Sequence, residues 1–82
     1  MITLIYRGPL AEKIGKKQEQ IHAATISDAL THIKTQYGSA TLKLAKSMLI
    51  TLNATNIQLL HGYKTPLKDG DSLAFLPLAA GG

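Results

Sequence analysis

The chain ends in two glycines, Gly81 and Gly82, whose type and position suggest chemistry more than any other residues do. Glycine loses more backbone entropy on ordering than any other residue, so a terminal pair of glycines contributes little to folding. Chain termini are usually poorly ordered, and we expect a flexible Gly-Gly tail here. Our interpretation is that the carboxylate of Gly82 is the functional group and that the remainder of the chain presents it. A tail without any function is the alternative.

The three histidines do not predict a metal site. His22, His32 and His61 fall in three different predicted elements, and no two of them show the i, i+4 spacing of paired ligands on a helix. His32 lies on the polar face of a predicted helix, where a solvated side chain is the ordinary outcome. We therefore expect no bound metal.

The remaining polar motifs do not predict catalysis either. The segment 69–71, Asp-Gly-Asp, is too short for a calcium loop and has the composition of a turn. The segment 8–17 contains glycines and lysines, but their spacing does not match a phosphate-binding loop. Asp28 and His32 could form an orienting pair, but no nucleophile accompanies them. The chain alone shows no apparatus for turnover, which leaves the C-terminus as the candidate for chemistry.

The bulk composition is that of one small globular domain spanning residues 1–82. Hydrophobic residues make up 45% of the chain and charged residues 17%, which is not the composition of a disordered protein. The absence of cysteine excludes disulfides, thiolate metal sites and a cysteine nucleophile. No apolar run approaches the roughly 18 residues that span a bilayer, and residues 1–6 lack the features of a secretory signal. We expect a soluble, cytoplasmic protein.

The formal net charge of +4 raises the question of a nucleic-acid partner. The nine basic residues are scattered, however, and only Lys13, Lys16 and Lys17 lie close together, with no aromatic residue among them. One Phe and three Tyr offer little surface for stacking on bases. We expect neither a nucleic-acid partner nor a membrane surface, and we interpret the charge as solvated or as facing a protein partner.

The first half of the chain predicts two strands that pair in antiparallel fashion. Apolar and polar residues alternate over residues 2–7, as in a strand with one face inward. Residues 8–9, Gly-Pro, end this strand, and residues 10–15 are expected to form a short loop or helical turn. Residues 17–23 show a weaker and more polar alternation, expected at a sheet edge. The inward residues of the first strand are expected to be Ile2, Leu4 and Tyr6.

A helix is expected to follow. The Thr25 hydroxyl can accept a hydrogen bond from an unpaired N–H of the first helical turn, while Asp28 reaches back and complements the helix dipole, which is typical of a helix start. An apolar stripe at helical spacing comes next. Gly38 is placed to end the helix in a left-handed conformation, and residues 40–46 predict a second, shorter helix. The stripe consists of Ile26, Ala29, Leu30, Ile33 and Tyr37.

The second half predicts three strands. The apolar segment 48–52 is expected to be central in the sheet, 57–60 to be a short strand, and 72–77 to be the last one. Turn chemistry separates them at 53–56 and 68–71. The order of elements indicates an α+β fold in which one main helix packs across a mixed sheet of four to five strands. The expected inward residues of the last strand are Leu73 and Phe75, and Gly70 is expected at positive φ.

The C-terminal motifs are distinctive in combination. Residues 66–71, Pro-Leu-Lys-Asp-Gly-Asp, precede a strand that ends at Pro77, and the chain then closes on Gly81 and Gly82. This arrangement resembles the MoaD/ThiS family of sulfur carriers, which are ubiquitin-like proteins of the β-grasp fold. The order of elements along the whole chain is similar to that of the family. Within the family, the chain most resembles the small subunit of molybdopterin synthase.

The resemblance implies a role for the C-terminus. An ATP-dependent enzyme of the ubiquitin-activating type would adenylate the carboxylate of Gly82, and sulfur delivered to this acyl-adenylate would leave a thiocarboxylate. The large subunit of molybdopterin synthase would then receive the tail, and the sulfur would pass to a pterin precursor of the molybdenum cofactor. The chain itself would bind no cofactor and would not be catalytic alone.

The resemblance also implies that the residues before Gly82 contact these partners. Glycine has no Cβ, so Gly81 would allow the tail to enter a narrow channel. An apolar segment would supply the docking surface. Two alternatives stay open: a carrier for another pathway, such as thiamine synthesis or tRNA thiolation, and a non-catalytic β-grasp module for interaction or protein modification. The docking segment consists of Leu76, Pro77, Leu78, Ala79 and Ala80.

Overall fold

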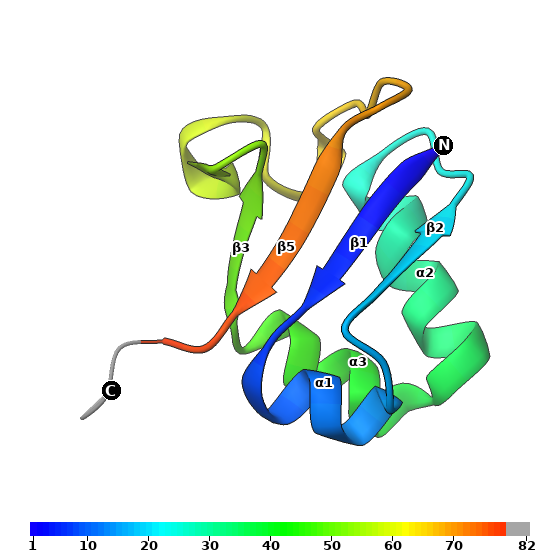
Figure 1. Cartoon of the computed structure of the whole chain (residues 1–82). Helices are drawn as coiled ribbons and strands as arrows, with labels where there is room; N and C mark the ends of the chain where they lie inside the picture. Colours follow the sequence, from blue (N-terminus) through cyan, green and yellow to red (C-terminus); the bar gives the residue numbers. More distant parts are fainter. Residues whose placement is uncertain (79–82) are drawn as a thin grey trace.

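The computed structural model describes residues 1–78, which form a mixed five-stranded sheet with a main helix packed across one face (Figure 1). The strand order is β2-β1-β5-β3-β4. The central strand β5 pairs parallel with β1 and antiparallel with β3, while β2 and β4 form the antiparallel edges. The predicted α+β fold with four to five strands is therefore confirmed. The strands are β1 Ile2–Tyr6, β2 Gln18–Ile21, β3 Leu49–Leu52, β4 Thr55–Asn56 and β5 Ser72–Leu76.

Helices make up most of the remaining described chain. They are α1 Gly8–Ile14, α2 Ile26–Tyr37, α3 Ser39–Lys46 and the two 3-10 helices η1 Ile57–Leu59 and η2 Gly62–Lys64. The main helix is α2, whereas α1 and α3 lie together at one end of the sheet (Figure 1). None of the helices within residues 1–78 combines the length and the apolar character needed to cross a membrane.

The core forms between α2 and the inner face of the sheet, as the alternation in β1 and β5 predicts. Leu73 and Phe75 of β5 are fully buried, and the predicted inward residues of β1 are buried beside them. The Tyr6 and Phe75 rings pack at a centroid distance of 6.0 Å. Burial of each large apolar side chain contributes about 1.5–3 kcal/mol, so this face of the sheet dominates the folding free energy. The predicted stripe of α2 is buried at Ile26, Ala29, Leu30 and Ile33, and Tyr37 is half-buried.

The N-terminus of α2 carries the predicted capping box. The Asp28 N–H donates to Thr25 Oγ1 at 3.2 Å, and the Thr25 N–H donates to Asp28 Oδ2 at 3.2 Å. A cap of this kind stabilises a helix by about 1 kcal/mol. At the other end, Gly38 has φ 96° and ψ 165°, so the predicted left-handed conformation is wrong. Because α3 begins at the next residue, the connection between the two helices is Gly38 alone, in a backbone region open almost only to glycine.

The predicted short strand at 57–60 is wrong, because this segment begins with the 3-10 helix η1. A two-residue turn at Asn53 and Ala54, both at positive φ, lets β4 start immediately and pair with the end of β3. Asn56 then ends the hairpin, since its Oδ1 accepts a hydrogen bond from the Gln58 N–H at 2.8 Å. The edge strand of the hairpin is thus the two-residue β4, which lies within the segment 53–56 that was expected to be a turn.

Two further expectations are refined by the tertiary structure. Strand β3 lies between β5 and the short edge strand β4, so the predicted central position of the 48–52 segment is confirmed, and the middle strand of the five is β5. The expected loop or turn at 10–15 is part of the seven-residue helix α1, which buries Leu10 completely against the core. The edge position predicted for the second strand is confirmed, because β2 pairs only with β1.

The two ends of the sheet are built differently. Strands β1 and β5 run in parallel toward the end where α1 and α3 lie, which we call the neck end (Figure 1). At the opposite end, the predicted tight turn contains Gly70 at φ 91°. There the ammonium group of Met1 pairs with the Asp69 carboxylate. The C-terminal segment of the chain therefore leaves the sheet far from the N-terminus.

Candidate functional site

The last described residues, Leu76, Pro77 and Leu78, form a segment that we call the neck. Leu76 is the final residue of β5, half-buried and paired opposite Leu49. Pro77 has no N–H to donate to a neighbouring strand, and the strand ends there as predicted. Leu78 is 57% exposed, which is high for a large apolar residue. The other predicted tail residues, Ala79, Ala80, Gly81 and Gly82, lie outside the described residues.

The neck rests on the connection between β1 and α1. The Arg7 N–H donates to the Phe75 carbonyl at 3.2 Å, just before the neck. Gly8 has φ +58°, and a Cβ atom at this residue would lie 3.2 Å from Pro77 Cγ. Gly8 is therefore required both by its backbone conformation and by the close approach of Pro77. Sequence reasoning identified this glycine only as the end of a strand.

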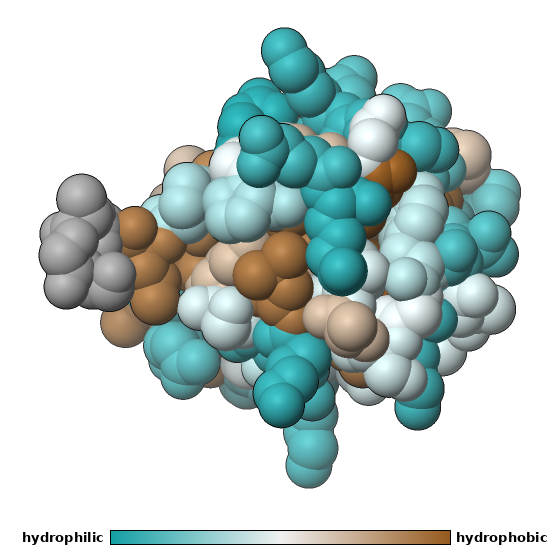
Figure 2. Space-filling model, turned by 90° about the horizontal axis from the view of Figure 1, so that it is seen from below, coloured by the Kyte–Doolittle hydropathy of each residue, from teal (hydrophilic) through white to brown (hydrophobic). Residues whose placement is uncertain are grey.

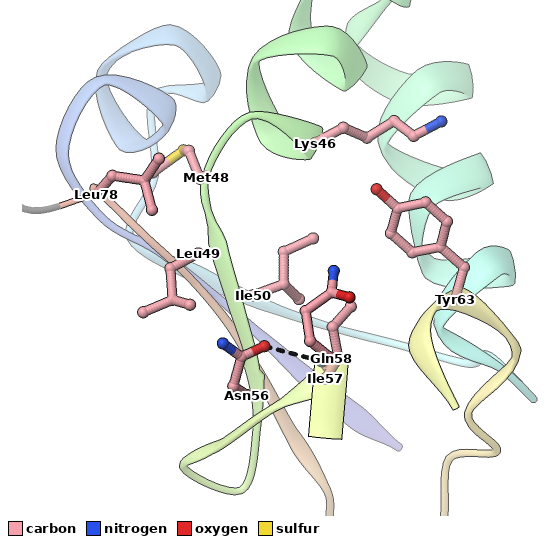
Figure 3. A pocket seen from close by; sticks show the side chains of 9 residues that line it. All are labelled: Lys46, Met48, Leu49, Ile50, Asn56, Ile57, Gln58, Tyr63 and Leu78. Atoms are coloured by element: carbon pink, nitrogen blue, oxygen red, sulfur yellow. Dashed lines mark hydrogen bonds between the residues drawn. The ribbon is translucent and has the colours of Figure 1, made fainter. Parts of the chain in front are cut away.

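A groove of about 200 Å³ opens beside the neck, and we call it the neck groove (Figure 3). It forms because β4 pairs with only the last two residues of β3, which leaves Leu49 and Ile50 without a strand on that side. Lys46 Nζ lies 5.2 Å from the Tyr63 ring centroid at one side of the groove. The lining consists of Lys46, Met48, Leu49, Ile50, Asn56, Ile57, Gln58, Tyr63 and Leu78.

A second polar arrangement, not predicted from the sequence, surrounds the Glu19 carboxylate; we call Tyr6, Lys16, Glu19, His32 and Tyr37 the Glu19 cluster. Three groups meet Glu19 Oε2: the hydroxyls of Tyr6 at 2.5 Å and Tyr37 at 2.8 Å, and His32 Nε2 at 3.3 Å. Lys16 Nζ lies 3.4 Å from Oε1. The Glu19 side chain is only 16% exposed. The cluster therefore ties β1, β2 and α2 together around one carboxylate.

The titration of the cluster follows from these contacts. Burial by itself would raise the pKa of Glu19, but the hydrogen bonds from Tyr6, Tyr37 and His32 outweigh it and hold the pKa below its ordinary value. The pKa of Tyr6 is raised, first by burial and then by its hydrogen bond to the carboxylate. Burial followed by the same carboxylate also raises the pKa of Tyr37. Glu19 is therefore ionised and both phenols are protonated at neutral pH.

The Glu19 cluster is a structural element. It contains no nucleophile with an adjacent base, and its carboxylate is occupied by protein donors. The predicted orienting pair of Asp28 and His32 is wrong, because Asp28 caps α2 while His32 contacts Glu19. A signal for the cluster was present in the sequence: alternation places Glu19 on the inward face of the edge strand, where a carboxylate requires donors. Across residues 1–78, no three His, Cys, Asp or Glu side chains gather in a way that could hold a metal ion.

Comparison with known proteins defines the class of this chain. The model of the ThiS family matches residues 4–82, and the chain belongs to this family. ThiS-family proteins are ubiquitin-like sulfur carriers, so the resemblance carried by the C-terminal motifs is confirmed. No curated protein sequence matches the chain significantly.

Solved structures share the fold over nearly the whole chain. The small archaeal modifier protein 1 of Methanosarcina acetivorans is 25% identical with a TM-score of 0.84, covering 99% of this chain and 95% of its own. A chain of the Amycolatopsis orientalis BexX/CysO complex is 22% identical, with a TM-score of 0.83 and full coverage of both chains. A chain of the Helicobacter pylori complex of subunits 1 and 2 of molybdopterin-converting factor is 24% identical, with a TM-score of 0.70, covering 99% and 97%. The predicted β-grasp fold is thereby confirmed.

Proposed function

We propose that this sulfur carrier works through a thiocarboxylate at Gly82 and serves as the small subunit of a molybdopterin synthase. The observation that carries the proposal is the family match, which extends through the Gly-Gly terminus to residue 82. It is supported by the neck, an apolar segment that leaves the central strand at an exposed position. The choice of the molybdenum pathway follows the resemblance of the C-terminal motifs to the small synthase subunit, and a chain of a molybdopterin-converting factor complex has this fold.

The chemistry requires an activating enzyme, because a carboxylate oxygen is a poor leaving group. The Gly82 carboxylate would attack the α-phosphorus of ATP, releasing pyrophosphate and forming an acyl-adenylate. A hydrosulfide equivalent would then attack the acyl carbon, AMP would leave, and a thiocarboxylate would remain. ATP is thus a substrate of the partner, and this chain supplies only the acyl group and the surface that the partner recognises.

The neck suits this role for a physical reason. Its anchor is rigid, since Leu76 belongs to the central strand and Pro77 packs against Gly8. Its tip is an exposed leucine beside a groove of mixed apolar and polar lining. An exposed large apolar side chain next to a groove gives a partner a surface to recognise. A partner can therefore recognise the folded domain at the neck and the C-terminus at its own active site.

A carrier for another acceptor is the second candidate. The BexX/CysO complex and the archaeal modifier protein share the fold at identities similar to that of the molybdopterin-converting factor chain. Such a carrier would supply sulfur for another pathway, for example thiamine synthesis or tRNA thiolation. A protein modifier is a separate alternative, and it would leave Gly82 in isopeptide bonds with lysines.

Two experiments separate these candidates. Co-expression with the adenylating enzyme of the same organism is expected to convert the chain to a form in which one oxygen is exchanged for sulfur, as measured by intact mass. An unchanged mass would refute the thiocarboxylate. The thiocarboxylated chain should then form molybdopterin from its pterin precursor when mixed with the large synthase subunit. Failure of that reaction, with the thiocarboxylate present, would reject the molybdenum pathway and favour another acceptor.

A further inference from the structure

Charge is distributed unevenly between the two ends of the molecule. Seven of the nine basic residues lie at the neck end, on α1, the chain beside it, the last turn of α2, and α3. Viewed from this end, the surface shows hydrophobic patches set among hydrophilic side chains (Figure 2). The opposite end carries only Lys64 and Lys68. The seven are Arg7, Lys13, Lys16, Lys17, Lys34, Lys43 and Lys46.

The acidic residues do not compensate this charge. Asp28, Asp69 and Asp71 lie at the opposite end, near the N-terminus of α2 and in the tight turn. Of the two acids at the neck end, Glu19 is already surrounded by its own cluster. Lys16 belongs to that cluster, so Glu12 on α1 is left to balance the other six basic side chains. The neck end is therefore strongly positive.

One of these basic residues, Lys46, lines the neck groove. Its ammonium group is held over the Tyr63 ring, while Leu78 lies across the groove from it (Figure 3). Among residues 1–78, no carboxylate lies within ion-pair distance of Lys46. The floor of the groove is apolar, formed in part by Ile50 and Ile57. The lining also includes the polar side chains of Asn56 and Gln58. A groove with an apolar floor, polar sides and a cation that has no carboxylate partner within residues 1–78 fits a ligand that combines an apolar side chain with a negative charge.

We propose that the neck groove is the docking site for an acidic segment of a protein partner, which inserts one large apolar side chain and places a carboxylate near Lys46. Its volume of about 200 Å³ is below the roughly 300–1,000 Å³ of small-molecule sites. Nucleic acid is disfavoured because Tyr63 is the only aromatic residue of the groove, whereas single-strand sites present several stacking platforms. The identity of the partner as the enzyme that acts on the tail rests on the proposed function.

The groove is tested on the unmodified full-length chain, so the result does not depend on thiocarboxylation. The probes are a short peptide with one phenylalanine flanked by glutamates, its counterpart with lysines, and a single-stranded oligonucleotide. Titrated into labelled protein, the acidic peptide is expected to shift the NMR resonances of Ile57, Tyr63 and Leu78. Binding should weaken when the salt is raised to 1 M, where the Debye length falls to about 3 Å.

Charge reversal gives the specific test. Lys46→Glu should weaken binding of the acidic peptide by about tenfold, because an attraction becomes a repulsion of similar size. Lys46→Gln should give an intermediate loss, and Lys68→Glu at the opposite end is the matched control, expected to change binding less than twofold. Equal losses for Lys46→Glu and Lys68→Glu would overturn the proposal, as would shifts outside the groove only, or stronger binding of the oligonucleotide there.

The same variants then identify the partner. With the adenylating enzyme, Lys46→Glu should raise KM by about tenfold and leave kcat unchanged, because the acyl group itself is intact. If no variant becomes thiocarboxylated while the peptide still binds the groove, the proposed function fails and the docking site stands. If thiocarboxylation proceeds with the same KM for both charge variants and the peptide does not bind, the docking site fails and the proposed function stands.

Discussion

The Glu19 cluster and the neck groove show two opposite uses of polar groups at the same end of one sheet. In the cluster, a half-buried carboxylate is met by donors from three elements of the fold. In the groove, Lys46 has no carboxylate partner among residues 1–78, and Leu78 is largely exposed. Satisfied and buried groups contribute to stability, whereas unpaired and exposed groups contribute to recognition. Substitutions in the two regions should therefore affect different measurements.

Removal of the cluster's carboxylate is expected to have the largest effect on stability. Glu19→Ala leaves the buried Tyr6 hydroxyl without its acceptor, and the loss should be about 2–3 kcal/mol in the free energy of unfolding. Denaturant unfolding measures it. Glu19→Gln, which keeps an acceptor oxygen, is the matched control and should lose less. Equal stability of the wild type and Glu19→Ala would contradict the structural role of the cluster.

Protonation of Glu19 at acidic pH should remove part of the stabilisation that its hydrogen bonds provide. The folded pKa of Glu19 is below its value in the unfolded chain, so the stabilisation is present at neutral pH and is lost as the pH falls below about 4.5 and through the folded pKa. The difference in unfolding free energy between the wild type and Glu19→Gln should therefore shrink over this range. Tyr6, Lys16, His32 and Tyr37 all face this carboxylate. A difference that stayed constant from pH 7 to pH 3 would show that the ionised form of Glu19 is not what the cluster stabilises.

Gly8 connects the folded core with the neck, and its substitution should have an intermediate effect. Gly8→Ala introduces a Cβ at positive φ, at a cost of about 1–2 kcal/mol, and the new atom would displace Pro77. The matched control is Gly15→Ala, which has φ +88° but meets no atom within 4 Å. Both variants should lose stability, but only Gly8→Ala should shift the NMR resonances of Leu78. Identical shifts of the Leu78 resonances in both variants would argue against a direct contact between Pro77 and Gly8.

Substitution of an exposed neck residue should have almost no effect on the free energy of unfolding. Leu78→Ser is expected to change the unfolding free energy by less than about 0.5 kcal/mol, because the side chain is mostly exposed. Under the proposed function, the same variant should raise the KM of the activating enzyme for the carrier. A large loss of stability with an unchanged KM would contradict this, because it would mean that Leu78 contributes to folding and not to recognition of the carrier.

The parts of the fold that depend on local pattern were predictable from the sequence. Alternation in β1 and β5 follows from a sheet with one buried face, and it placed Tyr6 and Phe75 correctly. The capping box at Thr25 depends on residues three apart, and it was predicted for that reason. The end of the last strand at Pro77 follows from a missing N–H.

The parts that depend on tertiary contacts were not predictable. An apolar run at 57–60 does not distinguish a strand from a 3-10 helix, and the side chain of Asn56 decides the outcome. The Glu19 cluster requires the register of β1 with β2 and the position of the far end of α2. The neck groove exists because β4 is short, which a single sequence does not reveal. Of the predicted site, Leu76, Pro77 and Leu78 are described, and the roles of all the predicted site residues stay predictions.

The most direct test of the sulfur-carrier chemistry is mass analysis of the C-terminal peptide after incubation of the purified chain with its adenylating enzyme, ATP and sulfide. The account predicts one sulfur-for-oxygen exchange, located by fragmentation at Gly82, and its complete loss in a chain that lacks Gly82. A peptide of unchanged mass, sulfur located at any other residue, or Gly82 joined to a lysine would contradict it.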